Sequence, residues 1–320
     1  MKRLSVILAG IAVATLVAGC SSGGSVAPVG PQPPPGPQFF AITTGGSELS
    51  QAVQAFDYYP NQMTIDAGDS ITWSNSENEP HVVAIPPAGQ MPPPGPPQPP
   101  VGGTTFDGTS YISSGFMAPN STYTVTFTKA GTYKVYCLIH QPEMVATIVV
   151  QPAGAAYPKW QGQYRSEGAA DLSFDLGVGA ASIASFPYPA GGTHLTAGIA
   201  PGLASGPPAQ TTVMRFMDKG NLDGQPLNTT IPVGTTLTWT NQSNNAPHTV
   251  SFPVAGQALP PGPPDGPAAG GATYDGTAYT SSGVIPPGGS YSLKFTAKGT
   301  FTYYCQFHAP EGMMGTVTVQ

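Results

Sequence analysis

The chain contains two copies of one pattern, and this duplication limits the folds open to it more than any other feature. Three blocks of the first half return in the second: GDSITWSN (68–75) as GTTLTWTN (234–241), FDGTSYISSG (106–115) as YDGTAYTSSG (274–283), and FTKAGTYKVYCLIH (127–140) as FTAKGTFTYYCQFH (295–308). The offset drifts only from 166 to 168 residues. A repeat of this length indicates two copies of a whole domain rather than a solenoid. With 320 residues, the chain is long enough for two domains of ordinary size.

Each copy carries the two-residue alternation that is typical of β-strands. In YTVTF (123–127) the large apolar side chains fall on one face and the threonines on the other, and YSLKF (291–295) places its large apolar side chains in the same way. Glycine-containing turn signals such as KAGT and AKGT separate these short runs. We therefore expect an all-β chain made of two tandem sandwiches or small barrels. The alternation also predicts that Cys137 and Cys305 point inward at the end of a strand.

The segment between the two copies has a different period. Within 157–186, the side chains of Trp160, Tyr164, Leu172 and Leu176 are spaced by four residues or by multiples of four. This spacing predicts a helical connector that packs against one domain. Glycines inside the segment oppose the prediction, because glycine lowers helix propensity.

The N-terminus has the features of an export signal. Lys2 and Arg3 precede an apolar run (4–17) that is too short for a membrane-spanning helix. The run ends in VAGC (17–20), which resembles a bacterial lipoprotein cleavage box, and a tether rich in proline, glycine and serine follows. We expect Cys20 to become the lipidated first residue of the mature protein, since more than one acyl chain anchors a protein stably to a membrane. The alternative is an ordinary signal peptide in which Cys20 is incidental.

These features divide the chain into five segments. They are a lipoprotein signal peptide (1–20), a tether (21–37), a first domain (38–151), a connector (152–188) and a second domain (189–320). Charged residues make up only 8% of the chain, the net charge is -6, and lysine and arginine do not cluster. Nucleic acid is therefore not an expected partner, because its phosphates require clustered basic side chains.

Both copies place a histidine, a cysteine, a second histidine and a methionine in the same order. The residues are His81, Cys137, His140 and Met144 in the first copy, and His248, Cys305, His308 and Met313 in the second. A thiolate and two imidazoles, with a thioether as a weak axial ligand, favour copper in an electron-transfer site. A closed zinc site would instead use four tightly held cysteine or histidine ligands.

Two other interpretations of the cysteines remain open. A buried free cysteine often serves only as a small apolar side chain, and two cysteines of an exported protein can form a disulfide. Neither interpretation explains why each cysteine has two histidines and a methionine in matching positions. His194 has no such neighbours in the sequence, and we expect it at the surface or at the start of a strand.

On these residues, both copies resemble cupredoxins, the blue copper proteins of the plastocyanin, amicyanin and pseudoazurin kind. The resemblance covers roughly 38–151 and 189–320. It is strongest in the G-D/T-x-[IL]-T-W-x-N strand, the Pro-His step and the Y-C-x2-H loop that leads through methionine into a final valine-rich strand. It implies a Greek-key β-barrel in each copy and a type 1 copper ion in each, bound by the four residues named above. In the second copy, the family's Met-x-Gly step favours Met313 over Met314 as the axial ligand.

The resemblance also implies how electrons would enter and leave. In the family they pass through the exposed edge of the second histidine, here His140 and His308, so redox partner proteins are expected to dock there. Neighbouring apolar residues, Leu138, Pro142, Phe307 and Pro310, would form the docking patch. One departure concerns the residue after the first histidine: many family members have an asparagine that braces the cysteine loop, whereas this chain has Val82 and Thr249.

The predicted function is that of an electron carrier anchored to a membrane of the cell envelope on its extracytoplasmic side. An enzyme is not expected. Copper nitrite reductases and multicopper oxidases need further histidines, one of them directly before the copper-binding cysteine, where this chain has Tyr136 and Tyr304. The alternative is a lipoprotein that binds, delivers or merely contains copper, or an adhesion module, with no redox role.

Overall fold

The structure is a computed structural model that describes residues 36–94, 99–140, 142, 144–200, 211–221, 223–244, 246–262 and 264–320. The first copy forms β1 (Phe39–Glu48), β2 (Val53–Tyr59), β3 (Gln62–Asp66), β4 (Ser70–Asn75), β5 (Ala84–Ile85), β6 (Thr105–Phe106), β7 (Ile112–Ser113), β8 (Ser121–Phe127), β9 (Gly131–Tyr136) and β10 (Val145–Gln151). The second forms β11 (His194–Ile199), β12 (Thr211–Met217), β13 (Leu227–Ile231), β14 (Thr236–Gln242), β15 (Ser251–Phe252), β16 (Thr273–Tyr274), β17 (Thr280–Ser281), β18 (Ser290–Phe295), β19 (Gly299–Tyr304) and β20 (Met314–Val319). A helix, α1 (Gln161–Ser185), lies between them in the sequence.

Each copy folds into a sandwich of two layers, which confirms the predicted all-β class with two tandem domains. In domain 1 the layers are β3-β10-β9-β5-β7 and β2-β1-β4-β8-β6, and domain 2 repeats them as β13-β20-β19-β15-β17 and β12-β11-β14-β18-β16. Trp73 of β4 and Trp239 of β14, from the repeated tryptophan motif, are fully buried between the layers. Large aromatic side chains contribute heavily to such cores because each removes a large apolar area from water.

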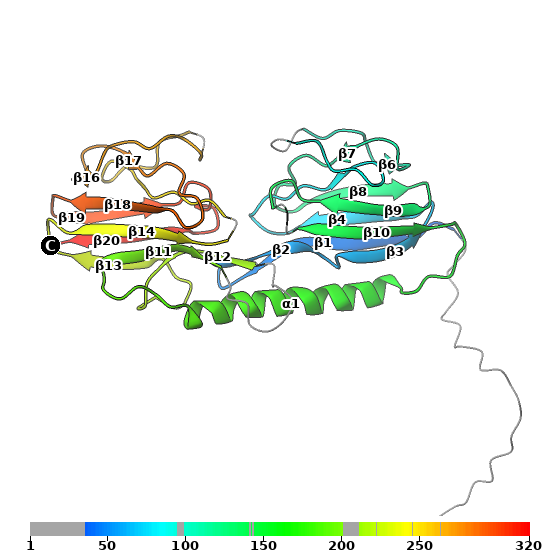
Figure 1. The fold of residues 1–320 in the computed structure, drawn as a ribbon, viewed down its shortest axis with the longest axis horizontal. Helices are drawn as coiled ribbons and strands as arrows, with labels where there is room; N and C mark the ends of the chain where they lie inside the picture. The colour runs from blue at the N-terminus through cyan, green and yellow to red at the C-terminus, as the bar shows by residue number, and fades with distance from the viewer. Residues whose placement is uncertain are drawn as a thin grey trace, which may run out of the picture.

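The two domains share one continuous sheet. Strands β2 and β12 lie at the edges of their own domains and pair antiparallel, with Thr211 opposite Ala55 and Val213 opposite Val53. Read inward from its two ends, the resulting ten-stranded sheet presents the equivalent strands of the two domains in the same order. The β2–β12 pair lies at its centre (Figure 1). This pairing covers two edges that would otherwise be open to another chain. The sequence patterns of the two domains did not predict this pairing.

Helix α1 runs along the outer face of the shared sheet, beneath both domains (Figure 1). It contacts β1 and β2 of domain 1 and β12 of domain 2. The helical connector is therefore confirmed, but the expectation that it packs against one domain is wrong. The reason is the β2–β12 pairing, which gives the helix one surface made by both domains.

Two of the glycines that opposed the helix prediction allow the helix to approach the sheet. A Cβ on Gly168 would lie 2.7 Å from the backbone of Tyr59 and Pro60, and one on Gly179 would overlap the side chain of Val53. Close approach also lets the hydroxyl of Tyr59 donate a hydrogen bond of 2.6 Å to Oδ2 of Asp175. Residues 168, 175, 179 and 182 are buried and face the sheet. Their spacing follows the helical period, and several of them have small side chains.

We predict opposite effects for two glycine substitutions in this helix. Gly168→Ala should lower the free energy of unfolding by about 1–3 kcal/mol, because the added methyl group has no room. Gly177→Ala is the matched control: its Cβ would meet nothing within 4 Å, so higher helix propensity should stabilise the protein by up to about 1 kcal/mol. Chemical denaturation followed by circular dichroism measures both, and equal effects of the two substitutions would contradict the packing argument.

Candidate metal centres

The predicted ligands of each domain meet at one end of its sandwich. His81 precedes β5 and is held by a two-way backbone bridge to Met117, with N···O distances of 3.4 and 2.8 Å. Cys137 follows β9 directly, and Met144 directly precedes β10. Cys137 and Met144 therefore lie at the ends of two paired strands of one sheet, which fixes their positions.

In domain 1 the donor atoms converge on one point. Sγ of Cys137 lies 3.4 Å from Nδ1 of His140 and 4.0 Å from Nδ1 of His81. One donor atom from each of these three residues lies within 4.8 Å of the other two. Both cysteines of the described residues are free and buried, so the disulfide interpretation is wrong for Cys137 and Cys305.

Domain 2 repeats the arrangement with tighter spacing. Nδ1 of His248 lies 3.1 Å from Nδ1 of His308, and Sγ of Cys305 lies 3.7 and 3.3 Å from these two nitrogens. Nε2 of His248 is buried with no hydrogen-bond partner among the described residues, so the polar contacts of this ring are made through Nδ1.

The donor set fits copper. Ligand atoms that bind one metal ion at about 2.0–2.3 Å lie about 3–4 Å from one another, and the nitrogen and sulfur atoms of both groups have this spacing. Two imidazoles and one thiolate in a trigonal arrangement are the equatorial ligands of an electron-transfer copper site. Met144 and Met313 are fully buried in the same clusters as their cysteines, whereas Met314 lies in β20 and is only partly buried. The role of Met144 and Met313 as axial ligands stays a prediction.

Backbone hydrogen bonds close each loop between cysteine and methionine. The N–H of Cys137 donates to the carbonyl of Met144 at 3.1 Å, and the N–H of Met144 donates to the carbonyl of His140 at 3.0 Å. In domain 2, Cys305 and Met313 make the first of these bonds at 3.0 Å, and Met313 donates to His308 at 2.9 Å. The second loop has one residue more between its histidine and its methionine than the first loop, and the clasp is kept.

Two buried asparagines of the repeated tryptophan motif hold the loop of the first histidine. Nδ2 of Asn75 donates to the carbonyls of Glu79 and Met117 at 3.0 and 2.9 Å. Nδ2 of Asn241 makes the same two bonds, to Ala246 and Ile285, both at 2.9 Å. The repetition of this asparagine in both copies was the available signal, but its role did not follow from the sequence.

Two glycines make room for the first histidine of each site. Gly45 and Gly198 lie at irregularities in β1 and β11, with φ of +65° and +68°. A Cβ on Gly45 would overlap the ring of His81, and a Cβ on Gly198 would overlap that of His248. Glycine is thus required at each position for two reasons, its positive φ and the space that the missing side chain leaves.

The residue after the first histidine differs between the domains in a way that matters. Thr249 accepts a hydrogen bond of 2.8 Å at Oγ1 from the N–H of Gln306, and its own N–H points at Sγ of Cys305 at 3.4 Å. The threonine therefore braces the cysteine loop, as the resemblance implied for an asparagine. Val82 has no side-chain acceptor, so domain 1 lacks this brace.

The second histidine of domain 1 has two further contacts that the sequence did not reveal. Its Nε2 lies 3.0 Å from Oε1 of Glu79, and the ring of Phe56 stacks on the imidazole with a centroid distance of 4.2 Å and an angle of 10°. Counted from the irregularities of β1–β2 and β11–β12, Phe56 of β2 and Met214 of β12 occupy equivalent positions in the two copies. His308 is thus not stacked in the same way.

Proton affinities differ between the two sites. Burial alone would raise the pKa of the Cys137 thiol, but His140 and His81 beside it lower that pKa well below its ordinary value. In domain 2, burial raises the pKa of Cys305 to about 11 and lowers the pKa of His308 to about 4. Burial opposes a proton on His140, but the neighbouring Cys137 raises the pKa of that ring most, and the hydrogen-bonded carboxylate of Glu79 raises it further. Metal binding requires deprotonated ligands, so it releases protons at both sites.

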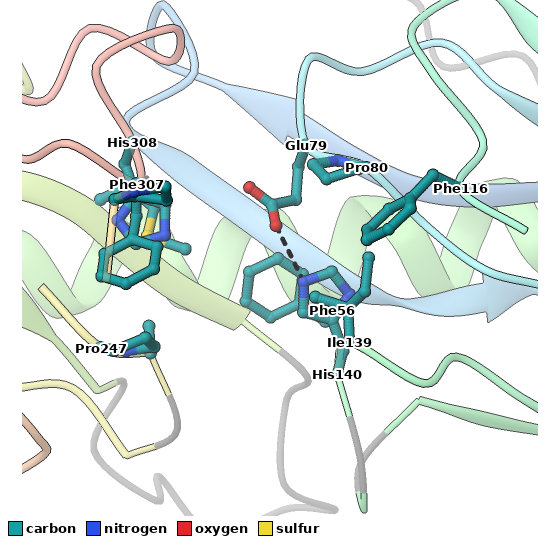
Figure 2. A pocket seen from close by; sticks show the side chains of 12 residues that line it. Phe56, Glu79, Pro80, Phe116, Ile139, His140, Pro247, Phe307 and His308 are labelled. Carbon is teal, nitrogen blue, oxygen red and sulfur yellow. Dashed lines mark hydrogen bonds and ion pairs between the residues drawn. The ribbon is translucent and has the colours of Figure 1, made fainter. Parts of the chain in front are cut away.

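The two sites face each other across a cavity of about 430 Å³ between the domains. Figure 2 shows His140 with Glu79, Phe116 and Ile139 on one side, and His308 with Phe307 and Pro247 on the other. The second histidines are recessed, with exposed fractions of 9% for His140 and 5% for His308. Of the expected docking patch, Phe307 lines the cavity with His308, whereas Leu138 packs against the core of domain 1. Pro142 and Pro310 are exposed.

Other sequence predictions fall outside the sites. Cys20, the signal peptide and most of the tether lie outside the described residues. His194 is exposed at the first position of β11, away from both ligand groups. Among the described residues, no helix combines the length and the apolar character that crossing a membrane requires.

The fold and the ligand groups define a protein of two β-sandwich domains, each with a buried cysteine and two histidines placed for one metal ion. The sequence model of one protein family, the copper-binding proteins of the plastocyanin/azurin family, matches residues 47–151 and 211–320. The chain therefore belongs to this family, and the resemblance to cupredoxins is confirmed.

Individual relatives match about one third of the chain. Plastocyanin from Scenedesmus fuscus is 36% identical over 109 residues, which are 34% of this chain and 98% of the plastocyanin. The chloroplastic plastocyanin of Tetradesmus obliquus is 34% identical over 103 residues, 32% of this chain, and the match spans 62% of that protein. The crystal structure of amicyanin from Paracoccus versutus aligns at 22% identity with a TM-score of 0.25, covering 35% of this chain and 80% of the amicyanin.

We predict that Gly45→Ala weakens metal binding in domain 1 by at least about tenfold, because the new methyl group displaces His81. Gly68→Ala is the control: its φ is +105°, so alanine is strained there too, but the Cβ would meet nothing within 4 Å. Metal titration in a Cys305→Ser background observes the domain 1 site alone. Equal losses of affinity in both variants would show that backbone strain, and not contact with His81, is responsible.

We predict that Thr249→Val destabilises the cysteine loop of domain 2 by about 1 kcal/mol, because the N–H of Gln306 loses its acceptor. Hydrogen exchange at Gln306 should become faster, whereas Thr249→Ser, which keeps the hydroxyl, should leave it slow. Unchanged exchange in Thr249→Val would mean that the threonine does not brace the loop.

Proposed function

We propose that the protein is a blue copper electron carrier with two type 1 sites on one chain, anchored to a membrane of the cell envelope on its extracytoplasmic side. The observation that carries this proposal is the repeated group of one cysteine and two histidines, at metal-ligand spacing, in a chain of the plastocyanin/azurin copper-binding family. Bound copper would supply a one-electron couple. One ion would be held by His81, Cys137, His140 and Met144, and the other by His248, Cys305, His308 and Met313.

The protein's own contribution is a rigid and water-poor ligand cage. The cysteines are fully buried, and Met144 and Met313 are buried with them. Strand ends, loop clasps and asparagine braces keep the donors converged, so little reorganisation accompanies electron transfer. Hydrogen bonding and hydrophobicity around a copper-bound cysteine tune the potential of such a site.

Redox partner proteins would dock over the rim of the interdomain cavity, which the rings of His140 and His308 line. Phe116, which lines the cavity and is 60% exposed, offers an apolar contact at this rim. Anchoring would come from lipid on Cys20. We do not propose an enzyme, because four of the five histidines of the chain belong to the two ligand groups and His194 lies apart from both.

Copper loading of the purified protein tests the proposal. We predict two copper ions per chain and an intense blue thiolate-to-copper absorption band, which Cys137→Ser and Cys305→Ser should each reduce to about half, because each removes one thiolate. Metal analysis, visible spectroscopy and electron paramagnetic resonance provide the readouts. Copper binding without a blue band in either domain would contradict electron transfer and favour a copper-holding or copper-delivery protein.

A further inference from the structure

Beside the second histidine, the two sites differ in the stacking of Phe56 and also at the position of Glu79. Nδ2 of Asn75 donates to the carbonyl of Glu79, and Nδ2 of Asn241 donates to the carbonyl of Ala246. Each of these acceptors stands two residues before the first histidine of its site, so they occupy equivalent positions. Domain 1 therefore has a carboxylate where domain 2 has a methyl group.

The carboxylate of Glu79 determines what each nitrogen of His140 does. Nε2 lies 3.0 Å from Oε1 of Glu79, while Nδ1 faces Sγ of Cys137 at 3.4 Å. A neutral ring can then carry its proton only on Nε2, donated to Glu79, which leaves Nδ1 free as a ligand atom. Stacking on Phe56 fixes the plane of the ring, and the side chains of His140 and Glu79 are both 9% exposed.

Domain 2 has no such arrangement among the residues that the structure describes. The carboxylate that acts electrostatically on His308 is again Glu79, but its hydrogen bond goes to His140. Glu311 is buried and interacts electrostatically with Glu79 and Arg215. In addition, the N–H of Thr249 points at Sγ of Cys305, which favours the reduced state of a site by drawing charge from the sulfur.

A carboxylate on the far nitrogen of a ligating histidine raises the basicity of the ligand. A more basic ligand, and a nearby negative charge of low exposure, favour the more positive oxidation state of the bound ion. We propose that Glu79 makes the domain 1 site the weaker electron acceptor of the two, so that an electron entering there passes on to the domain 2 site. This inference rests on the proposed function, because it needs copper in both sites.

The shared cavity gives this transfer a route within the chain. The rings of His140 and His308 both line it, and each ring turns its Nδ1 toward its own cysteine sulfur. With copper bound in both sites, one electron would leave the domain 1 site, taking its ion from Cu(I) to Cu(II), and would enter the domain 2 site, taking its ion from Cu(II) to Cu(I). No proton needs to move, because the proton on Nε2 of His140 stays shared with Glu79.

The reduction potential of each site tests the role of Glu79. In the copper-loaded protein, Cys305→Ser leaves the domain 1 site for measurement and Cys137→Ser leaves the domain 2 site. Redox titration should find the lower potential in domain 1. Glu79→Gln, added to Cys305→Ser, should raise that potential by a tenfold change in the ratio of Cu(II) to Cu(I) affinities, about 59 mV for one electron. The amide keeps the shape of the side chain but removes its charge.

Two further variants separate a specific role from a structural one. Ala246→Glu, added to Cys137→Ser, places a carboxylate at the equivalent position and should lower the potential of the domain 2 site. Glu77→Gln, added to Cys305→Ser, removes the charge of a nearby carboxylate that accepts a hydrogen bond from Ser47 and not from a metal ligand. This variant should leave the potential nearly unchanged. In the Cu(I) state, the Nε2 proton of His140 should exchange slowly with solvent in the parent and faster in Glu79→Gln.

The outcomes distinguish this inference from the function on which it rests. If neither site forms a blue copper centre, the proposed function fails. If both sites form but Glu79→Gln leaves the domain 1 potential unchanged, or if domain 1 has the higher potential, then the role assigned to Glu79 is wrong while the two-site carrier stands.

Discussion

The antiparallel pairing of β2 with β12 is the interaction on which the rest of the structure depends. It joins the domains through a sheet ladder, and Arg215 of β12 reinforces it by donating from Nη2 to the carbonyl of Ser50 in domain 1 at 2.5 Å. Because the two domains meet through these edge strands, their ligand-bearing ends face one cavity. Helix α1 then packs across the joint and contacts strands of both domains. A flexible tandem of the same two sandwiches would not hold the second histidines on opposite sides of a shared space.

The two similar domains have dissimilar sites because the residues around the repeated ligands differ. Strand β2 contributes Phe56 to the ring of His140, and the aligned position of β12 is Met214. The loop before the first histidine contributes Glu79 in one copy and Ala246 in the other, held by equivalent asparagines. Thr249 braces the cysteine loop of domain 2, whereas Val82 cannot brace that of domain 1. The ligands are repeated while their surroundings have diverged, which is how one fold can provide two different reduction potentials.

Much of this could be predicted from the sequence, for local reasons. The ligand groups were predictable because C-x2-H and the following methionine are close in the chain, and because the whole set occurs twice. The strands were predictable because side chains alternate between faces with a period of two. The packing face of α1 was harder to predict because Gly168 and Gly179 line it, and small residues at a close contact resemble helix-weakening residues in a sequence.

The joint and the tuning residues were not predictable, for physical reasons. Every residue of β2 and β12 is buried, so neither strand has a polar face that would mark an exposed edge or a partner. Glu79 is one acidic residue in a polar loop, and its contact with His140 joins positions 61 residues apart. Gly45 and Gly198 recur in both copies, but their contact with the first histidine depends on strand irregularities that have no sequence signature of their own.

The central claim is that two copper sites lie close together, face to face, on one chain. Pulsed electron paramagnetic resonance of the fully oxidised, copper-loaded protein tests it most directly, because two nearby Cu(II) ions interact through their magnetic dipoles. The account predicts a dipolar interaction in the parent that is absent from Cys137→Ser and from Cys305→Ser and does not change on dilution. A parent spectrum that equals the sum of the spectra of these two variants, with two coppers bound, would contradict it.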